Sequence, residues 1–539
     1  MEFNLADLFE AAVDAFAERE YLVAGGQRRT YAQMEERANR LAHHLQASGV
    51  QPGDHVGIYA YNSVEWVESL WAVFKIRAVW ININYRYVED ELAYLFENAD
   101  LVALIYQREF GPRVAAVRPR LPLLRHAIVI EDGTDGRDAT EAMAAVNYEA
   151  AVASGRPERD FLPRSAGDRY ILFTGGTTGM PKGVVWRHED VFFALGGGID
   201  AMTKERVTRP QQMVEKGKAG FPVTMLPIAP LMHGATQWSV MSQSFTGNKV
   251  VLVAKFDADE VLRLVGEEKV NAIMITGDAM ARPIVNALEA GQADGRYDTS
   301  SLLAISSTAA LFSPSVKDDL LRLLPNLQIS EAIGSSESGN NGLVRIEAGH
   351  TAMKGGPTVS PQPGTVVLDE DLKPLPPGTG KIGKLARSGD IPIGYYKDPA
   401  KTAETFVIGA DGVRYSMPGD YATVEEDGNI TLLGRGSVSI NSGGEKIYPE
   451  EVEAAIKSHP AVWDATVVGV PDERWGQRVA AIVELRSGAR VTLEDLQGHC
   501  RAKIAGYKVP RQLTIVTSMM RSPSGKPDYR WAAQVARGD

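Results

Sequence analysis

The sequence has a single cysteine, Cys500, among its 539 residues. One thiol cannot close a disulfide within the chain, and it cannot supply a metal site built from several cysteines. Chains that work in oxidising surroundings usually carry paired cysteines. This scarcity therefore predicts a cytoplasmic protein.

Long apolar runs and basic leader segments are missing as well. The longest apolar stretches, such as 250–254 and 467–470, are far shorter than the ~20 residues of a membrane-spanning helix. Residues 1–20 are acidic and the last four match no lipidation or peroxisomal signal, so we expect no targeting segment. With 57 Lys and Arg against 68 Asp and Glu, the net charge of −11 disfavours general binding to nucleic acid or anionic membranes.

What is present predicts a folded α/β protein. Hydrophobic residues make up 44% and charged residues 23%, which is ordinary for a globular chain. A capping-box pattern at 30–33 starts a helix that Gly49 can end. Helix and strand signals then alternate, which favours parallel strands covered by helices. The expected strands are 55–60, 78–83 and 101–106, and the expected helices are 64–74 and 88–98.

The later part of the chain repeats this alternation and then changes character. Segment 355–433 is dense in Pro and Gly with short β-rich runs, which predicts a small β-barrel-like subdomain. From about residue 434 the patterns predict a compact α+β domain. The charged segment 203–218 is expected to be a surface loop of low order. Further expected helices are 257–268, 279–290, 449–457 and 493–502, and further strands are 272–276, 303–306, 465–470, 479–485 and 512–516.

A strand running into a glycine- and threonine-rich loop, 170–185, carries the sharpest chemical signal. Its glycines let backbone amides approach an anion closely, its threonines add donors, and Lys182 adds positive charge. This pattern predicts a phosphate cradle, with an ordinary turn as the plain alternative. It is not a Walker loop, because Pro181 and Gly183 stand where that motif needs Gly and Ser or Thr.

Residues 174–183 resemble the signature loop of the adenylate-forming (AMP-binding) enzymes, which include acyl-CoA synthetases, luciferases and adenylation domains of peptide synthetases. The family loop reads Thr-Ser-Gly-Thr-Thr-Gly-x-Pro-Lys-Gly, and only Gly175 departs from it. The resemblance covers nearly the whole chain. It implies a large ATP- and acyl-binding domain at 1–436, made of two layered α/β subdomains and the β subdomain. A small mobile α+β lid at 437–539 would carry the catalytic lysine.

Segment 333–337 is similar to the family's Tyr-Gly-x-Thr-Glu motif. The resemblance implies that Glu337 holds Mg²⁺ and that Ser336 contacts the α-phosphate, in keeping with the preference of Mg²⁺ for carboxylate and phosphate oxygens. Ile333 replaces the usual Tyr that flanks adenine. Taken alone, such a run is more typical of a helix cap.

The remaining motifs follow in family order. Segment 306–311 resembles the adenine-binding turn, and 417–420 resembles the segment that binds the ribose. Segment 434–453 resembles the connection between the domains, with Ser437 at a hinge position where the family has Asp or Lys. Segment 521–526 resembles the motif of the catalytic lysine, whose ammonium would stabilise two anions forced together.

The acyl site is less clear from the sequence. The segment that contains His233, Gln237 and Trp238 resembles the family's acyl-pocket region, although a buried structural His is equally compatible with the pattern. Segments 186–188 and 277–282 resemble actinobacterial CoA ligases for fatty acids and steroid side chains. Fatty, steroid and aryl acids all stay open as substrates.

We therefore expect an ATP-dependent acyl-CoA synthetase that uses ATP, Mg²⁺, coenzyme A and a hydrophobic carboxylic acid, and a homodimer is compatible with it. Alternatives are an acyl-AMP ligase that loads a carrier protein, an aryl-CoA ligase, a luciferase-like oxygenase and a catalytically silent nucleotide-binding regulator. The expected catalytic residues are Lys526, Thr178 and Glu337. The expected ATP-binding residues are Thr174, Gly175, Gly176, Thr177, Thr178, Gly179, Lys182, Ser307, Thr308, Ala309, Ile333, Gly334, Ser336, Asp420, Arg435 and Lys526. The expected coenzyme A channel is Gly443, Gly444 and Glu445.

Overall fold

The computed structural model forms two compact units. The first comprises Met1–Ile273 and Asp390–Phe406, and the second comprises Met274–Gly389 and Val407–Asp539. The domain boundary predicted at 436/437 lies within the second unit and stays a prediction. The structure describes residues 2–538 except 175–179, 201, 293–294, 347–355, 443–444, 473–474 and 523–524.

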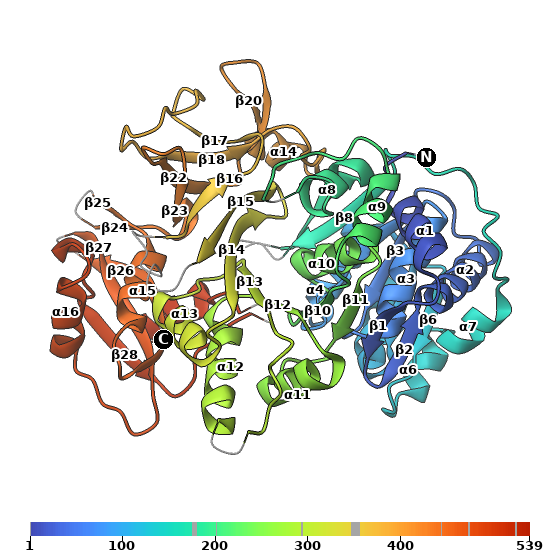
Figure 1. Cartoon of the computed structure of the whole chain (residues 1–539), viewed down its shortest axis with the longest axis horizontal. Coiled ribbons are helices and arrows are strands. Elements are labelled where there is room, and N and C mark those ends of the chain that lie inside the picture. The colour runs from blue at the N-terminus through green and yellow to red at the C-terminus, as the bar shows by residue number, and fades with distance from the viewer. Residues whose placement is uncertain are drawn as a thin grey trace. The chain divides into compact units, whose positions relative to one another are not determined.

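A mostly parallel sheet lies at the centre of the first unit (Figure 1). Six neighbouring strands of this sheet, from β8 (Arg169–Thr174) at one end to β7 (Val146–Asn147) at the other, pair in parallel. Strand β9 (Lys182–Arg187) is antiparallel to both its neighbours. The predicted parallel arrangement is thus confirmed. The strand order is β19 (Gly394–Tyr395), β9 (Lys182–Arg187), β8 (Arg169–Thr174), β4 (Val79–Asn82), β3 (His55–Tyr59), β5 (Leu101–Gln107), β6 (His126–Ile130) and β7 (Val146–Asn147).

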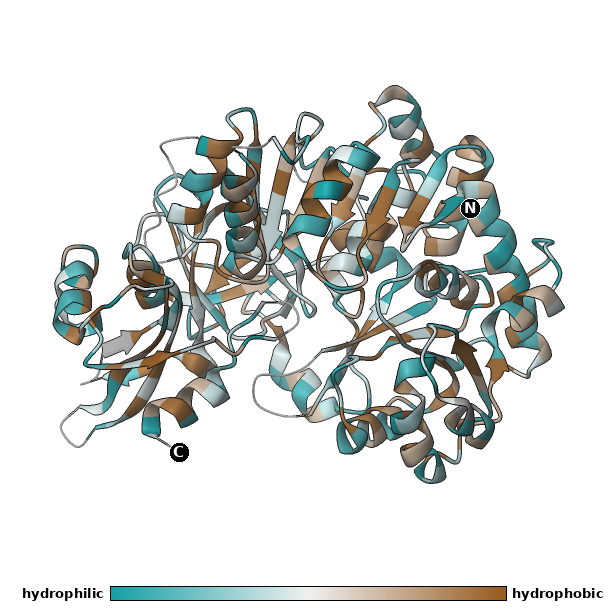
Figure 2. Ribbon diagram, turned by 90° about the horizontal axis from the view of Figure 1, so that it is seen from below, coloured by the Kyte–Doolittle hydropathy of each residue, from teal (hydrophilic) through white to brown (hydrophobic). Residues whose placement is uncertain are grey.

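Helices cover both faces of this sheet, because successive strand residues point to opposite sides. Ile58 and Ile105 share one core with α1 (Leu5–Phe16), α2 (Tyr31–Ala47), α3 (Val64–Lys75), α7 (Tyr148–Ser154), α8 (His188–Leu195) and α10 (Gly234–Ser244). Leu104 and Tyr106 share another with α4 (Glu89–Asn98) and α5 (Gly111–Val117). Helix α2 begins with the predicted capping box of Thr30 and Gln33. Figure 2 shows the strands largely in the brown of hydrophobic residues.

A second sheet of the first unit runs in the order β2 (Gln27–Thr30), β1 (Glu20–Ala24), β11 (Lys249–Leu252) and β10 (Thr224–Pro227). The helix that follows β11, α11 (Ala258–Glu268), was expected from its spacing. The prediction of a loop over 203–218 is wrong for its second half, where α9 (Gln211–Ala219) forms. The helix is stable because Met213 and Gly217 on one face are buried, while its charged residues face outward.

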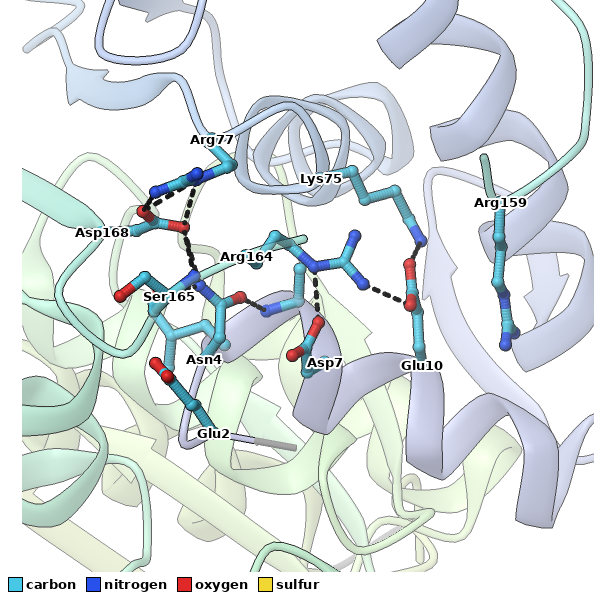
Figure 3. Close-up of polar contacts among 12 residues, drawn as sticks. Glu2, Asn4, Asp7, Glu10, Lys75, Arg77, Arg159, Arg164, Ser165 and Asp168 are labelled. Atoms are coloured by element: carbon cyan, nitrogen blue, oxygen red, sulfur yellow. Dashed lines mark hydrogen bonds and ion pairs between the residues drawn. The ribbon is translucent and has the colours of Figure 1, made fainter. Parts of the chain in front are cut away.

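A polar network ties the N-terminal helix to the rest of the first unit (Figure 3). Arg164 contacts both Asp7 and Glu10 of α1. The fully buried Lys75 places its Nζ 2.5 Å from Glu10 and 2.8 Å from Glu35. Burial alone would raise the pKa of Glu10, but Lys75 and Arg164 outweigh it and lower that pKa. This continuous set of paired charges, which we call the α1 network, fixes the helix in place.

The second unit begins with strands and helices in alternation and continues as antiparallel β-structure. Strands β13 (Ala304–Thr308) and β14 (Gln328–Ser335) are parallel, with helices α12 (Asp278–Gly291) and α13 (Pro314–Leu323) between β12 (Ala272–Ile275) and β14. The antiparallel part, the predicted β subdomain, has its own small core. From β14 the order continues through β15 (Gly339–Ile346), β16 (Thr358–Pro361), β23 (Ile430–Arg435), β22 (Asp420–Val424), β18 (Gly383–Arg387), β21 (Arg414–Ser416) and β20 (Phe406–Ile408), and β17 (Thr365–Leu368) pairs with β18.

The last hundred residues form the predicted α+β fold. The strand order is β25 (Glu445–Ile447), β24 (Ile440–Ser442), β27 (Gly476–Leu485) and β26 (Val462–Asp472), and β28 (Gln512–Val516) pairs with β27. Helices α15 (Pro449–Lys457) and α16 (Leu493–Arg501) share one core with this sheet, and α17 (Tyr529–Arg537), which was not predicted, shares another. Cys500 is fully buried, and burial raises its pKa to about 11, so the thiol is a packing group. Among the described residues, no helix is long and apolar enough to cross a membrane.

Candidate active site

The predicted phosphate loop lies at the tip of the β8–β9 hairpin. Thr174 and Lys182 are cross-strand partners, so the structure places the two ends of the loop side by side. Residues 175–179, which include the predicted ATP contacts Gly175, Gly176, Thr177, Thr178 and Gly179, lie outside the described residues.

Asn82, at the end of β4, anchors the base of this loop and was missed by the sequence motifs. Its Nδ2 donates to the carbonyls of Phe173, at 2.9 Å, and Met232, at 2.6 Å, and its Oδ1 accepts from the Phe173 N–H at 2.8 Å. Asn82 is buried, so all three bonds form away from water. One side chain thereby fixes the residue before Thr174 and the residue before His233. An asparagine inside an otherwise apolar strand was the available signal.

Lys182 forms an ion pair with Asp398, a second residue that the motifs did not identify. Asp398 also caps α14 (Pro399–Thr405), where its Oδ1 accepts from the Lys401 N–H at 2.9 Å. The Lys182 ammonium and this N–H hold the pKa of the Asp398 carboxyl below its usual value. Asp398 therefore orients the lysine side chain.

The predicted acyl-pocket residues stand at the start of α10. His233 is the residue before the helix and is half-buried. Gln237 is fully buried; its Nε2 donates to the Leu231 carbonyl at 2.8 Å, and its Oε1 accepts from the Tyr170 hydroxyl at 2.7 Å. Trp238 is 7% exposed. Because both ends of the Gln237 amide are engaged, this residue ties α10 to β8. The acyl-pocket role of the three residues stays a prediction.

In the second unit, the predicted adenine turn follows β13. Ser307 is buried, and its Oγ accepts from the Gly277 N–H at 3.1 Å, so its hydroxyl serves the backbone. Thr308 ends the strand, and the exposed Ala309 follows with φ of 69°. Left-handed backbone normally favours glycine. Ala309 thus adopts the conformation that a glycine-rich turn would have.

The predicted Mg²⁺ and α-phosphate residues lie on the β14–β15 hairpin. Ile333 packs into the β-subdomain core, and the strand bulges between Ile333 and Gly334. A Cβ on Gly334 would lie 2.3 Å from the Gly339 carbonyl oxygen, so the turn needs glycine there. Ser336 and Glu337 follow, both half-buried. The Ser416 hydroxyl donates to the Glu337 carbonyl at 2.5 Å and fixes that position.

Asp420 and Arg435 are direct cross-strand partners on β22 and β23. The motifs, 15 positions apart in the sequence, gave no sign of this register. The strand register therefore brings together the residue expected to bind the ribose, Asp420, and the residue expected to contact the nucleotide, Arg435. Ser437 follows in a short turn, Gly436–Val438, and Glu445 opens β25. Gly443 and Gly444 lie outside the described residues.

The predicted catalytic lysine, Lys526, is exposed, and its backbone bonds to Ser522. Its N–H donates to the Ser522 Oγ at 3.1 Å, and its carbonyl accepts from the Ser522 N–H at 2.8 Å. The neighbouring Gly525 has φ of 74°, and a Cβ there would lie 2.8 Å from the Ala279 Cβ and 3.0 Å from the Thr276 carbonyl oxygen. The lysine loop is therefore packed against the start of α12, next to Gly277, which bonds the adenine turn.

Sequence models of known families match most of this chain. A model of the AMP-binding enzyme matches residues 9–396, and a model of the AMP-binding enzyme C-terminal domain matches residues 451–526. The chain belongs to the AMP-binding enzyme family. The family resemblance drawn from the motifs is confirmed.

Named relatives cover almost the full length. The chain is 56% identical over 534 residues to a 3-oxocholest-4-en-26-oate–CoA ligase of Rhodococcus rhodochrous, and the matched region covers 99% of this chain and 96% of the relative. It is 52% identical over 531 residues to a medium/long-chain-fatty-acid–CoA/3-oxocholest-4-en-26-oate–CoA ligase of Mycobacterium tuberculosis, which spans 98% and 96%. These relatives agree with the narrower resemblance to fatty-acyl and steroid side-chain CoA ligases.

The fold is also similar to solved structures. A crystal structure of the anthranilate CoA ligase AuaEII in complex with anthranoyl-AMP matches with a TM-score of 0.84 at 23% identity, covering 99% of this chain and 98% of that one. At this identity the likeness shows the fold alone. It confirms the predicted mixed α/β class.

Proposed function

We propose that the chain is an AMP-forming acyl-CoA synthetase for a hydrophobic carboxylic acid. The identity of 56% to a CoA ligase over nearly the whole chain carries this proposal. The ordered set of nucleotide motifs on the hairpins and turns described above supports it.

In the first half-reaction, a carboxylate oxygen of the acid bonds to the α-phosphorus of ATP, and pyrophosphate leaves. We assign the phosphate loop 174–182 to the ATP phosphates, with Thr178 as a catalytic residue of that loop. Asp420 and Arg435 take the ribose and phosphate, and 307–309 with 333–336 take adenine and the α-phosphate. Lys526 stabilises the two anions as they approach, a role that a mobile ammonium suits.

The residues fit a magnesium ion beside the phosphates. Mg²⁺ in such enzymes is usually held by one or two carboxylates together with substrate oxygens. Glu337 supplies one carboxylate on a hairpin turn that Ser416 fixes. Among the described residues there is no group of three acidic, His or Cys side chains that would form an all-protein metal site. When bound, the ion neutralises charge on the departing pyrophosphate.

In the second half-reaction, the sulfur of coenzyme A bonds to the acyl carbonyl carbon, and AMP leaves. We propose that residues 437–539 act as a lid that turns about Ser437 between the two steps. The turn would withdraw Lys526 and bring Gly443, Gly444 and Glu445 to the thiol path. The short turn at Gly436–Val438 supports a pivot there.

The acid that we favour is a medium- or long-chain fatty acid or a steroid side-chain acid. The relatives named for these acids, together with the buried Trp238 and His233 at the start of α10, support a hydrophobic pocket. Pyrophosphate release should be measured across fatty, aryl and steroid carboxylates, with and without coenzyme A.

Acid-dependent pyrophosphate release together with thioester formation is the expected result. Pyrophosphate release followed by transfer only to a carrier protein would favour the acyl-AMP ligase alternative, and preference for aryl acids would favour an aryl-CoA ligase. Binding of ATP without pyrophosphate release for any acid would identify a silent nucleotide-binding regulator and overturn the proposal.

A further inference from the structure

A line of buried charges connects the loop of Lys526 to the start of α12. The Arg521 guanidinium donates to both oxygens of Asp464, at 2.5 and 2.6 Å, and to the Gly525 carbonyl at 2.8 Å. Lys457, at the end of α15, places its Nζ 3.1 Å from Asp464 and 3.4 Å from the Asp278 carboxylate. Lys457 is only 4% exposed and Asp278 11%, so their contact is shielded from water. We call this line the lysine-loop clasp.

Ser313 fixes the Asp278 side chain through the carboxylate oxygen that does not face Lys457. Its Oδ1 accepts from the Ser313 N–H at 2.8 Å and from the Ser313 hydroxyl at 3.1 Å. It is the first residue of α12, where the helix dipole favours a negative charge. The second oxygen, Oδ2, is the one that faces Lys457.

Helix α15 touches the preceding part of the chain at both of its ends. At its N-terminus, the Glu450 carboxylate lies close against Gly434, and the Tyr448 ring lies 6.1 Å from the Tyr421 ring between centroids. At its C-terminus, Lys457 reaches Asp278. The first of these contacts involves Gly434, two positions before the turn at 436–438. The second lies at the other end of the nine-residue helix, about 12 Å along its axis, so a rotation about the turn would displace it further than the first.

We propose that Asp278 and Lys457 form a releasable ion pair that positions the lysine loop for acyl-AMP formation and separates for the coenzyme A step. The inference rests on the proposed function. Asp278 and Lys457 are positioning residues, because they act through Arg521 and Gly525 on Lys526. The pair would favour the orientation in which Gly525 packs against Ala279, and it would not contribute to thioester formation.

The test uses the full-length enzyme and separates its half-reactions. Acyl-AMP formation is followed as pyrophosphate release without coenzyme A, and the second step as thioester formation from supplied acyl-AMP. Asp278→Asn keeps the acceptor for Ser313 and replaces the charged acceptor that faces Lys457 by an amide N–H₂. We expect it, and Lys457→Met, to slow acyl-AMP formation on the order of tenfold while changing the second step less than twofold.

The pairing itself is tested by combination and rescue. The double variant should be no slower than Lys457→Met alone, because Lys457→Met already removes the contact with Asp278 in addition to the one with Asp464. Asp278→Glu, which keeps the charge, should recover most of the first half-reaction. Glu451→Gln is the matched control. Glu451 is on α15, as Lys457 is, but its ion pair, at 2.6 Å, is with Lys508 in the turn Gly506–Lys508, so both partners lie within the last hundred residues.

Several outcomes would overturn the inference. Equal losses in both half-reactions would indicate a purely structural role, and an unchanged first half-reaction would remove the pair from catalysis. Losses that multiply in the double variant would show that the two residues act separately. Failure of the wild-type enzyme to release pyrophosphate would instead contradict the proposed function, so the two failures are distinguishable.

Discussion

The α1 network and the lysine-loop clasp are both lines of buried charges, but they join different kinds of partner. In the α1 network, Lys75 contacts both Glu10, as Figure 3 shows, and Glu35, and every member belongs to the first unit. In the clasp, the Lys457 Nζ lies 3.1 Å from Asp464, which belongs to the same α+β fold, and 3.4 Å from Asp278, which does not. Loss of Lys75 removes a shared cation from two buried carboxylates. Loss of the Asp278 contact, by contrast, leaves Lys457 paired with Asp464. The first arrangement fixes a helix, and the second can be released.

The largest expected effect on stability comes from Lys75→Met. Removing the cation leaves Glu10 and Glu35 partly uncompensated in a buried site, which should lower the free energy of unfolding by about 3–5 kcal/mol. Chemical denaturation measures this, and both half-reactions should decline together. Glu267→Gln, which breaks an exposed pair with Arg263 in the same unit, should cost less than about 0.5 kcal/mol. Similar losses in the two variants would contradict the distinction between buried and exposed pairs.

Asp278→Asn should separate stability from activity. Since Lys457 retains Asp464, the variant leaves no buried charge without a partner, so we expect the free energy of unfolding to fall by less than the about 3–5 kcal/mol of Lys75→Met, despite the slower acyl-AMP formation. Thermal unfolding of the variant beside the wild type measures this. A loss as large as that of Lys75→Met would mean that the clasp is as fixed as the α1 network.

Acidification should weaken the first unit before it affects the clasp. His126 at the start of β6 lies 3.0 Å from His44 of α2 between Nε2 atoms, and burial, together with His44, lowers the pKa of His126 to about 4. An unfolded His titrates near ~6.5. The unfolded chain therefore binds more protons between these values, so stability is complete above about pH 6.5 and declines as pH falls toward 4.

Asp464 behaves differently over the same range. Burial would raise its pKa, but Lys457 and Arg521 outweigh burial and lower it, so this carboxylate stays ionised.

Denaturation midpoints measured at pH 7 and pH 5 test the role of His126. The wild type should lose stability between the two pH values, and His126→Gln should lose less. A variant with the same pH dependence as the wild type would show that the histidine pair does not cause the loss.

The smallest expected effect is a gain in the adenine turn. Ala309→Gly relieves a left-handed backbone and should raise the free energy of unfolding by about 0.5–1 kcal/mol. Ala310→Gly, one position on, should give no gain, because Ala310 lacks a positive φ. The melting temperatures of the two variants provide the comparison, and equal shifts would contradict the assignment of strain to Ala309.

Local patterns predicted local structure well. Helix α2 follows its capping box because Thr30 and Gln33 bond within one turn. The prediction of a loop over 203–218 failed, because α9 is stabilised by the burial of Met213, and local polarity does not show the surface against which Met213 packs. The motifs identified Asp420 and Arg435, but their pairing follows from strand register.

Sequence patterns could not predict the contacts of the lysine-loop clasp or those of Asn82. Lys457 and Asp278 are 179 positions apart and carry no shared motif. Asn82 meets Phe173 across 91 positions, and only the strand order β8-β4 brings them together. Such contacts depend on topology, which helical or strand periodicity does not encode.

The central claim is that Lys526 serves acyl-AMP formation and not the coenzyme A step. Measuring both half-reactions of Lys526→Ala tests it most directly. We expect pyrophosphate release to fall by about 10²–10³-fold, as for the loss of one group that stabilises transition-state charge, while thioester formation from supplied acyl-AMP changes little. Equal losses in the two half-reactions, or undiminished pyrophosphate release, would contradict it.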